Sequence, residues 1–203
     1  MDTRVEQLRA SSGEANTHGL SDELVNSFLK IDPNLGIALD LAIKARENLD
    51  DEVEDLLLKL TESQFASELQ KDFVNFYEPS TVNPYIPLAA KGPWIITTHG
   101  AVVHDNGGYG MLGMGHDPTE VMSSMSESHV MANVMTPSVT HKRFADTLKR
   151  EVGHTRGSCP FDRFICMNSG SESVTVAMRI SDINARLMTD QDGPHHGKEI
   201  WTV

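Results

Sequence analysis

The stretch RFICM-NSGSE-SVTVAMRI, at 163–180, constrains the fold of this chain most strongly. The short apolar run RFICM has the composition of a buried strand, and the small polar residues after it are typical of a tight turn. The residues that follow place Val174, Ala177 and Met178 on one side of a helix. A strand, a tight turn and a helix in direct succession predict an α/β fold.

The turn NSGSE has the features of a phosphate-binding site. The first backbone N–H groups of a helix lack partners within the helix, and the helix dipole places partial positive charge behind them. Gly170 lets an anion approach the backbone closely, while Ser169 and Ser171 add hydroxyl groups. The alternative is that the turn merely supplies a serine that caps the helix.

A second glycine-rich stretch, GGYGMLGMGH at 107–116, requires a different interpretation. Its residues Gly108, Gly110 and Gly113 have the G-x-G-x-x-G spacing of a dinucleotide-binding loop. That fingerprint needs a helix that begins at the last glycine, whereas the predicted helix has Pro118 at its first position. We therefore expect these glycines to serve another purpose than holding a nucleotide.

The remaining sequence predicts a boundary near residue 80. Residues 1–19 are polar and small, which predicts a flexible N-terminus, and residues 20–80 predict a helical segment. The predicted helices of that segment cover 21–30, 36–47, 51–60 and 61–76. Residues 81–203 form the second module; its predicted elements are an extended proline-rich connector, a hairpin or two short strands in WIITTHGAVVHDNGG, helices over 117–130 and 138–152, and a strand over 199–203.

Composition excludes several classes of protein. A net charge of −12 argues against a nucleic-acid partner and against an anionic membrane surface. No apolar run approaches the roughly 20 residues that cross a bilayer, and the N-terminus lacks the apolar core of a secretory signal. Cys159 and Cys166 are too few for a disulfide framework, and the pair His195–His196 lacks further ligands at metal-binding spacing. We expect a cytoplasmic protein without a metal site.

Two stretches together resemble a known family. VVHDNGGYGMLGMGHDPTEV, followed by FADTLKREVGH and FICMNSGSESVTVAMRIS, is similar to the class III, or subgroup II, aminotransferases that use pyridoxal phosphate. The resemblance covers roughly residues 85–203 and implies the N-terminal portion of the fold type I, aspartate-aminotransferase-like architecture. It also implies a homodimer that moves an amino group from an amine or amino acid to a 2-oxo acid.

The resemblance assigns roles to individual residues. It implies that Gly170 and Ser171 hold the cofactor phosphate through backbone N–H groups and a hydroxyl, that Ser169 opens the turn, and that Glu172 supports the site. It places Tyr109 facing the substrate, with a packed core tyrosine as the alternative.

The family's catalytic groups have no counterpart in this sequence. The Schiff-base lysine and the aspartate against the pyridine nitrogen follow the strand that resembles EIWTV, so they are expected beyond residue 203. We therefore expect the fragment to be inactive alone. Two alternatives remain open: an aminomutase, decarboxylase or racemase of the same fold, and a non-catalytic binding or assembly module built on a truncated α/β scaffold.

Overall fold

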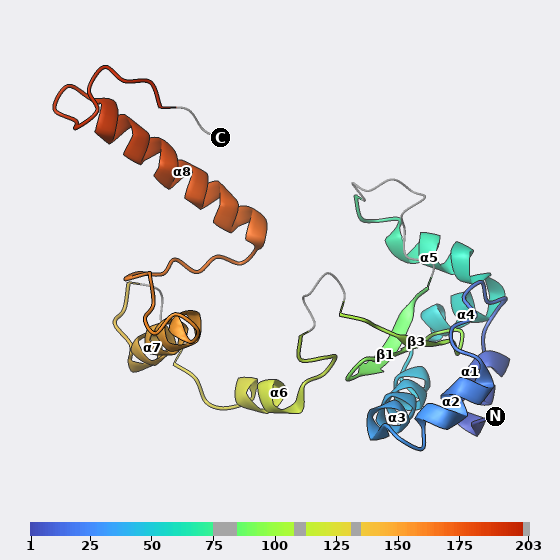
Figure 1. Ribbon diagram of the computed structural model, residues 1–203. Helices are drawn as coiled ribbons and strands as arrows, with labels where there is room; N and C mark the ends of the chain where they lie inside the picture. The colour runs from blue at the N-terminus through green and yellow to red at the C-terminus, as the bar shows by residue number, and fades with distance from the viewer. Residues whose placement is uncertain (75–84, 108–112, 131–134, 201–203) are drawn as a thin grey trace. The chain divides into compact units, whose positions relative to one another are not determined.

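A computed structural model describes residues 1–74, 85–107, 113–130 and 135–200. The chain divides into two units, Met1–Ser128 and His129–Val203 (Figure 1). The division therefore falls at residue 128, whereas composition had suggested a boundary near residue 80. The reason lies in the core of the first unit, to which helices and strands from both sides of residue 80 contribute.

In the first unit, helices come before a small antiparallel sheet. The helices are α1 (Thr3–Ala10), α2 (Asp22–Phe28), α3 (Pro33–Glu47), α4 (Asp51–Lys59) and α5 (Glu62–Gln70), and α6 (Thr119–Met125) follows the sheet. The strands are β1 (Pro87–Lys91), β2 (Trp94–Thr97) and β3 (Val102–His104), paired in the order β1-β2-β3.

The hairpin β2–β3 was predicted correctly from its β-branched residues. Its register pairs Trp94 with His104 and Ile96 with Val102. In the turn, Thr97 Oγ1 accepts a hydrogen bond of 2.9 Å from the N–H of Ala101. The strand β1 was not predicted, because its residues lie in the proline-rich segment that had indicated a connector. Pro87 is its first residue, a position where a missing N–H is tolerated.

The core of the first unit lies where α1 and α3 pack together and α3 packs on β1 and β2. Leu35 and Leu39 of α3 and Trp94 and Ile96 of β2 are at most 1% exposed. The Trp94 ring packs against Phe28 with ring centroids 5.0 Å apart. Fully burying side chains of this size contributes about 1.5–3 kcal/mol each, so the helices and the sheet stabilise one another.

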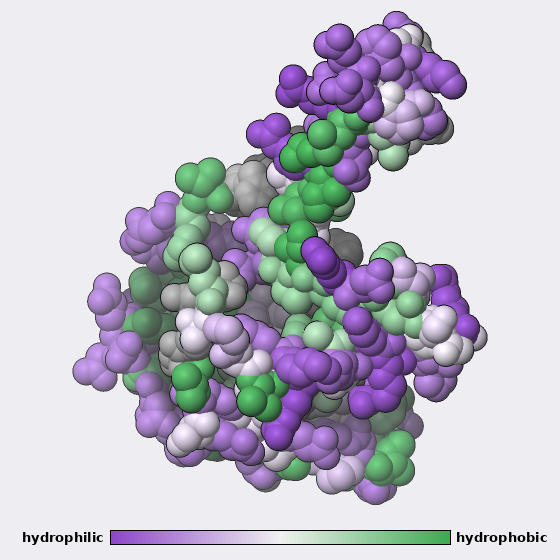
Figure 2. Space-filling model, turned by 90° about the vertical axis from the view of Figure 1, so that its left-hand side faces the viewer, coloured by the Kyte–Doolittle hydropathy of each residue, from purple (hydrophilic) through white to green (hydrophobic). Residues whose placement is uncertain are grey.

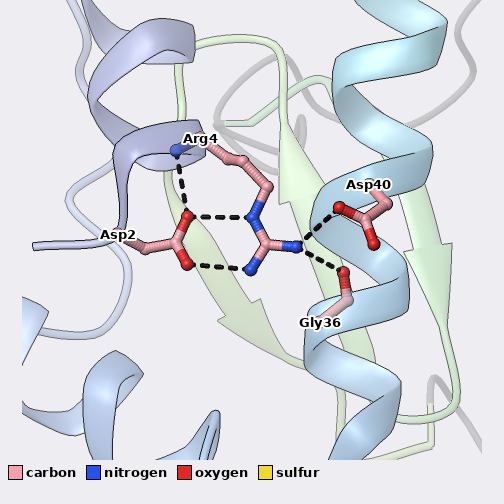
Figure 3. A network of polar contacts seen from close by, with 4 residues as sticks. All are labelled: Asp2, Arg4, Gly36 and Asp40. Carbon is pink, nitrogen blue, oxygen red and sulfur yellow. Dashed lines mark hydrogen bonds and ion pairs between the residues drawn. The ribbon is translucent and has the colours of Figure 1, made fainter.

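The N-terminal residues belong to this core, although their composition had predicted a flexible segment over 1–19. Val5 and Leu8 of α1 are 1% and 0% exposed. The helix is also held by Arg4, which pairs with Asp2 through two side-chain hydrogen bonds and donates to Gly36 O and Asp40 of α3 (Figure 3). Two apolar residues in a polar helix are too few to give a periodic pattern, so the sequence alone did not reveal them.

The second unit contains two helices among its described residues, α7 (Val139–Gly153) and α8 (Gly170–Thr189). Ser138 caps α7 by accepting a hydrogen bond from the N–H of His141, so the helix predicted over 138–152 is confirmed. Gly153 is the one residue of this unit's described part that is buried. A Cβ there would lie 2.8 Å from the backbone nitrogen of Cys159, which requires glycine.

Two predicted strands of the second module need correction. Residues 163–167, predicted to be a buried strand, form no strand; Phe164 is half-buried and its neighbours are exposed. The described residues of this unit include no second strand with which RFICM could pair. The α/β architecture therefore stays a prediction. Most of the predicted strand over 199–203 lies outside the described residues, and Glu199 and Ile200 form none.

Candidate functional site

Two hydrogen bonds from backbone N–H groups to side chains hold the turn before α8. Ser169 is the N-cap, and its Oγ accepts a hydrogen bond of 3.2 Å from the N–H of Glu172. The Glu172 side chain reaches one residue further back, where its Oε2 accepts a hydrogen bond of 2.9 Å from the N–H of Asn168. This arrangement is close to a capping box. Ser169 and Glu172 therefore both stabilise the helix start, the role that the sequence had left as the alternative for the serine.

Gly170 and Ser171 present the groups that remain available to a ligand. As the first two residues of α8, their backbone N–H groups have no acceptor within the helix. Both residues are exposed, and a Cβ built on Gly170 would meet no atom within 4 Å. The 20-residue helix adds partial positive charge at this end. Backbone N–H groups and a seryl hydroxyl in this setting fit a phosphate group.

The apolar side chains of α8 are uncovered within its unit. None of its residues is buried, and Figure 2 shows hydrophobic residues gathered along this helix. The exposed apolar side chains are Val174, Met178, Ile180, Ile183, Leu187 and Met188. Such a wide apolar surface is typical of a helix that is buried in a complete fold.

The described residues on either side of the glycine-rich stretch, 105–107 and 113–116, contact one another in the first unit. Gly92 and His116 exchange backbone hydrogen bonds of 3.0 and 2.8 Å. His116 Nε2 lies 3.1 Å from Asp105 Oδ2, and Asp105 Oδ1 accepts a hydrogen bond from the N–H of Gly107. These residues line a pocket of about 510 Å³. Tyr109, the predicted substrate-facing residue, lies outside the described residues, as do Gly108 and Gly110.

Lys91 makes a further fastening that the sequence did not indicate. Its Nζ donates to Asp117 O at 2.5 Å, Asp117 Oδ2 at 2.8 Å and Thr119 Oγ1 at 2.9 Å. Asp117 has a φ of +46° and precedes the N-cap, which is Pro118. The prediction that Pro118 is the first helical residue was therefore wrong by one position, since Pro118 is the N-cap and the Asp117 carboxylate pairs with Lys91 instead of capping α6.

The two predicted motifs are placed by different units, the glycine-rich loop by the first and the NSGSE turn by the second. Helix α6 starts at Thr119, six positions after Gly113, so the arrangement that a dinucleotide fingerprint requires is not met there. Among the described residues, no group of three or more histidine, cysteine, aspartate or glutamate side chains could hold a metal ion.

Comparison of the chain with models of protein families, with curated proteins and with solved structures gave no match. Within the described ranges, no helix combines the length and the apolar composition that crossing a membrane requires.

Proposed function

We propose that this chain is the N-terminal portion of a pyridoxal-phosphate-dependent aminotransferase of the class III type, which moves an amino group from an amine or amino acid to a 2-oxo acid. The observation that carries the proposal is the start of α8. Its first two N–H groups are unpaired within the helix, its glycine leaves the approach open, and its cap holds the turn in place. The family resemblance of residues 85–203 supplies the identity of the anion.

Each residue of the turn has a defined task in this proposal. Gly170 and Ser171 bind the phosphate through N–H groups, and the Ser171 hydroxyl adds a third donor. Ser169 and Glu172 do not need to touch the ligand, because their side chains accept hydrogen bonds from the N–H groups of Glu172 and Asn168 and so fix the direction in which the free N–H groups point. When bound, pyridoxal phosphate supplies an electron sink for the reaction.

The proposal extends to the whole protein. We expect a cytoplasmic homodimer in which the lysine and the aspartate that act on the cofactor come from sequence beyond residue 203. The uncovered apolar side chains of α8 and of α7 support a fold that is completed by further sequence, since such helices bury their apolar faces in a finished domain. The same fold hosts aminomutases, decarboxylases and racemases, and the reaction subtype depends on groups outside this chain.

Binding of pyridoxamine 5′-phosphate tests the proposal on this chain. Its amine cannot form an imine with surface lysines, so nuclear magnetic resonance of the ¹⁵N-labelled protein reports phosphate anchoring alone. We expect the amide signals of Gly170 and Ser171 to shift with added ligand, and unphosphorylated pyridoxamine to leave them unchanged. The proposal would be contradicted by equal shifts with both compounds, or by shifts confined to other amides.

A matched pair of variants separates charge from shape. Gly170→Asp places a carboxylate beside the phosphate, whereas Gly170→Asn has nearly the same volume without the charge, and the open space at Gly170 accommodates both. We expect Gly170→Asp to weaken binding at least about fivefold more than Gly170→Asn, as repulsion of an anion at a helix start predicts. Equal affinities of the two variants would remove this turn as the phosphate site.

A further inference from the structure

Three buried polar side chains lie close to the segment 11–17 of the first unit. They come from three different elements: Arg46 from α3, Glu62 from the first position of α5, and His99 from the turn between β2 and β3. Their exposed fractions are 7%, 0% and 1%. Each contains one buried atom without a hydrogen-bond partner among the described residues, namely Arg46 Nη1, Glu62 Oε1 and His99 Nε2.

The other polar atoms of these side chains are firmly held. Glu62 Oε2 accepts hydrogen bonds of 2.7 Å from the N–H groups of both Asn16 and Thr17. Arg46 Nη2 donates to Ser11 O at 2.5 Å. These bonds fasten both side chains to one short segment.

The His99 side chain is held in the same neighbourhood. Its Nδ1 lies 2.9 Å from Thr98 Oγ1, and its ring centroid lies 6.4 Å from that of Phe65 on α5. Together with Thr17, it lines a pocket of about 700 Å³. Burial lowers the pKa of the His99 imidazole, with further effects from Glu62, which raises it, and Arg46, which lowers it. Glu62 precedes Phe65 by three positions on α5, so its side chain lies on the same side of that helix as the ring that contacts His99.

We infer that a buried water molecule binds between Arg46, Glu62 and His99. A group in this position has to accept a hydrogen bond from Arg46 Nη1 and donate one to Glu62 Oε1, which a hydroxyl does and a pure donor or acceptor does not. Buried waters typically make about three hydrogen bonds to otherwise unpaired groups.

The water site has a structural consequence for the pocket beside it. Leaving a buried polar group unpaired is costly, so one water that satisfies three such groups stabilises the junction of α3, α5 and the β2–β3 turn. The segment 11–17 is hydrogen-bonded to Glu62 and Arg46. It forms part of the wall of the pocket that His99 also lines, through Ser12, Gly13, Ala15 and Thr17.

Water-selected nuclear Overhauser spectroscopy on the full chain with labelled histidine tests the site directly. We expect a cross-peak between water and the His99 ring protons whose sign indicates residence longer than a nanosecond, and no such long-lived contact at the exposed His141. The Thr98→Val variant removes the hydroxyl that could relay the signal, and the cross-peak should persist in it. Absence of the His99 cross-peak, or its loss in Thr98→Val, would overturn the inference.

Oxygen-17 relaxation dispersion, which counts long-lived waters, gives a second readout. The His99→Phe variant keeps an aromatic ring against Phe65 but removes Nε2, so the dispersion amplitude should fall by the equivalent of one water. An unchanged amplitude in a folded His99→Phe protein would argue against the site. If this variant does not fold, the cross-peak experiment on the unaltered chain decides the matter alone.

Discussion

Replacing Arg4 with methionine should lower the free energy of unfolding by about 2–3 kcal/mol, because charge-assisted hydrogen bonds of partly buried groups contribute about 1.5–3 kcal/mol. The guanidinium meets Asp2 through Nε at 2.9 Å and Nη2 at 2.8 Å. The side chains of Arg4 and Asp2 are 26% and 16% exposed, so solvent screens them only in part. The partner Asp40 is 72% exposed and adds about 0–1 kcal/mol. Methionine keeps the length of the aliphatic stem, so most of the loss is polar.

Urea unfolding, followed by far-ultraviolet circular dichroism and by tryptophan fluorescence, measures this loss. Lys59→Met is the matched control, since Lys59 forms an exposed ion pair with Asp55 whose side chains are 68% and 56% exposed. We expect the control to change the free energy of unfolding by at most about 0.5 kcal/mol, the usual size for such helix pairs. Equal effects of the two substitutions would refute the view that Arg4 anchors α1 to α3.

The pH dependence provides an independent check on the same pair. The hydrogen bond with the Arg4 side chain holds the pKa of Asp2 below its ordinary value of 3.8. A carboxyl whose pKa is depressed in the folded state stabilises the protein above that value, and the contribution disappears as the pH falls through the folded-state pKa. The difference between the unaltered chain and Arg4→Met should therefore shrink below pH 3.8. A difference that stays constant with pH would contradict the pairing.

Three further predictions concern single positions. Gly19→Ala should destabilise the protein, because φ is +63° and a Cβ would lie 2.5 Å from Val102 O. Gly36→Ala, where α3 has open space for a Cβ, should instead stabilise the protein by about 0.5–1 kcal/mol. Urea unfolding compares the two variants. Because burial lowers the pKa of His99, the free energy of unfolding should decline as the pH falls below 6.5. Denaturation at pH 5–7 should show a smaller decline in His99→Gln, and an equal decline in both proteins would contradict this. Ser169→Ala should reduce the stability of the α8 start by about 1 kcal/mol, seen as faster amide exchange at Glu172, with unchanged exchange as the contrary result.

Several local features could be predicted because their signals lie within a few residues. Helices α2 and α7 begin within one position of the predicted starts at 21 and 138, and in each case the serine at the predicted start is the N-cap. The hairpin β2–β3 followed from β-branched residues interrupted by glycine. In the candidate phosphate site, Ser169 was recognised both as a ligand and as a cap, and the structure places it in the cap.

Other features depend on residues far apart in the sequence, and no local pattern reports them. The contacting residues Asp105 and His116 are 11 positions apart, and Lys91 reaches Asp117 across 26. In RFICM a local pattern predicted a strand that does not form. An apolar run becomes a strand only where another strand offers backbone groups for hydrogen bonding. The described part of the second unit offers none.

The sequence by itself therefore determined the starts of several helices, such as α2, α4 and α7, together with the hairpin and the small-residue turn at 168–172, since capping and turn formation depend on neighbouring residues alone. Only the tertiary structure decided that the N-terminal helix α1 joins the core, that the helices and the sheet form one unit, and that Arg46, Glu62 and His99 lie buried along one segment. Burial is a property of what packs against a side chain, and in this protein the packing partners are separated by many positions of sequence.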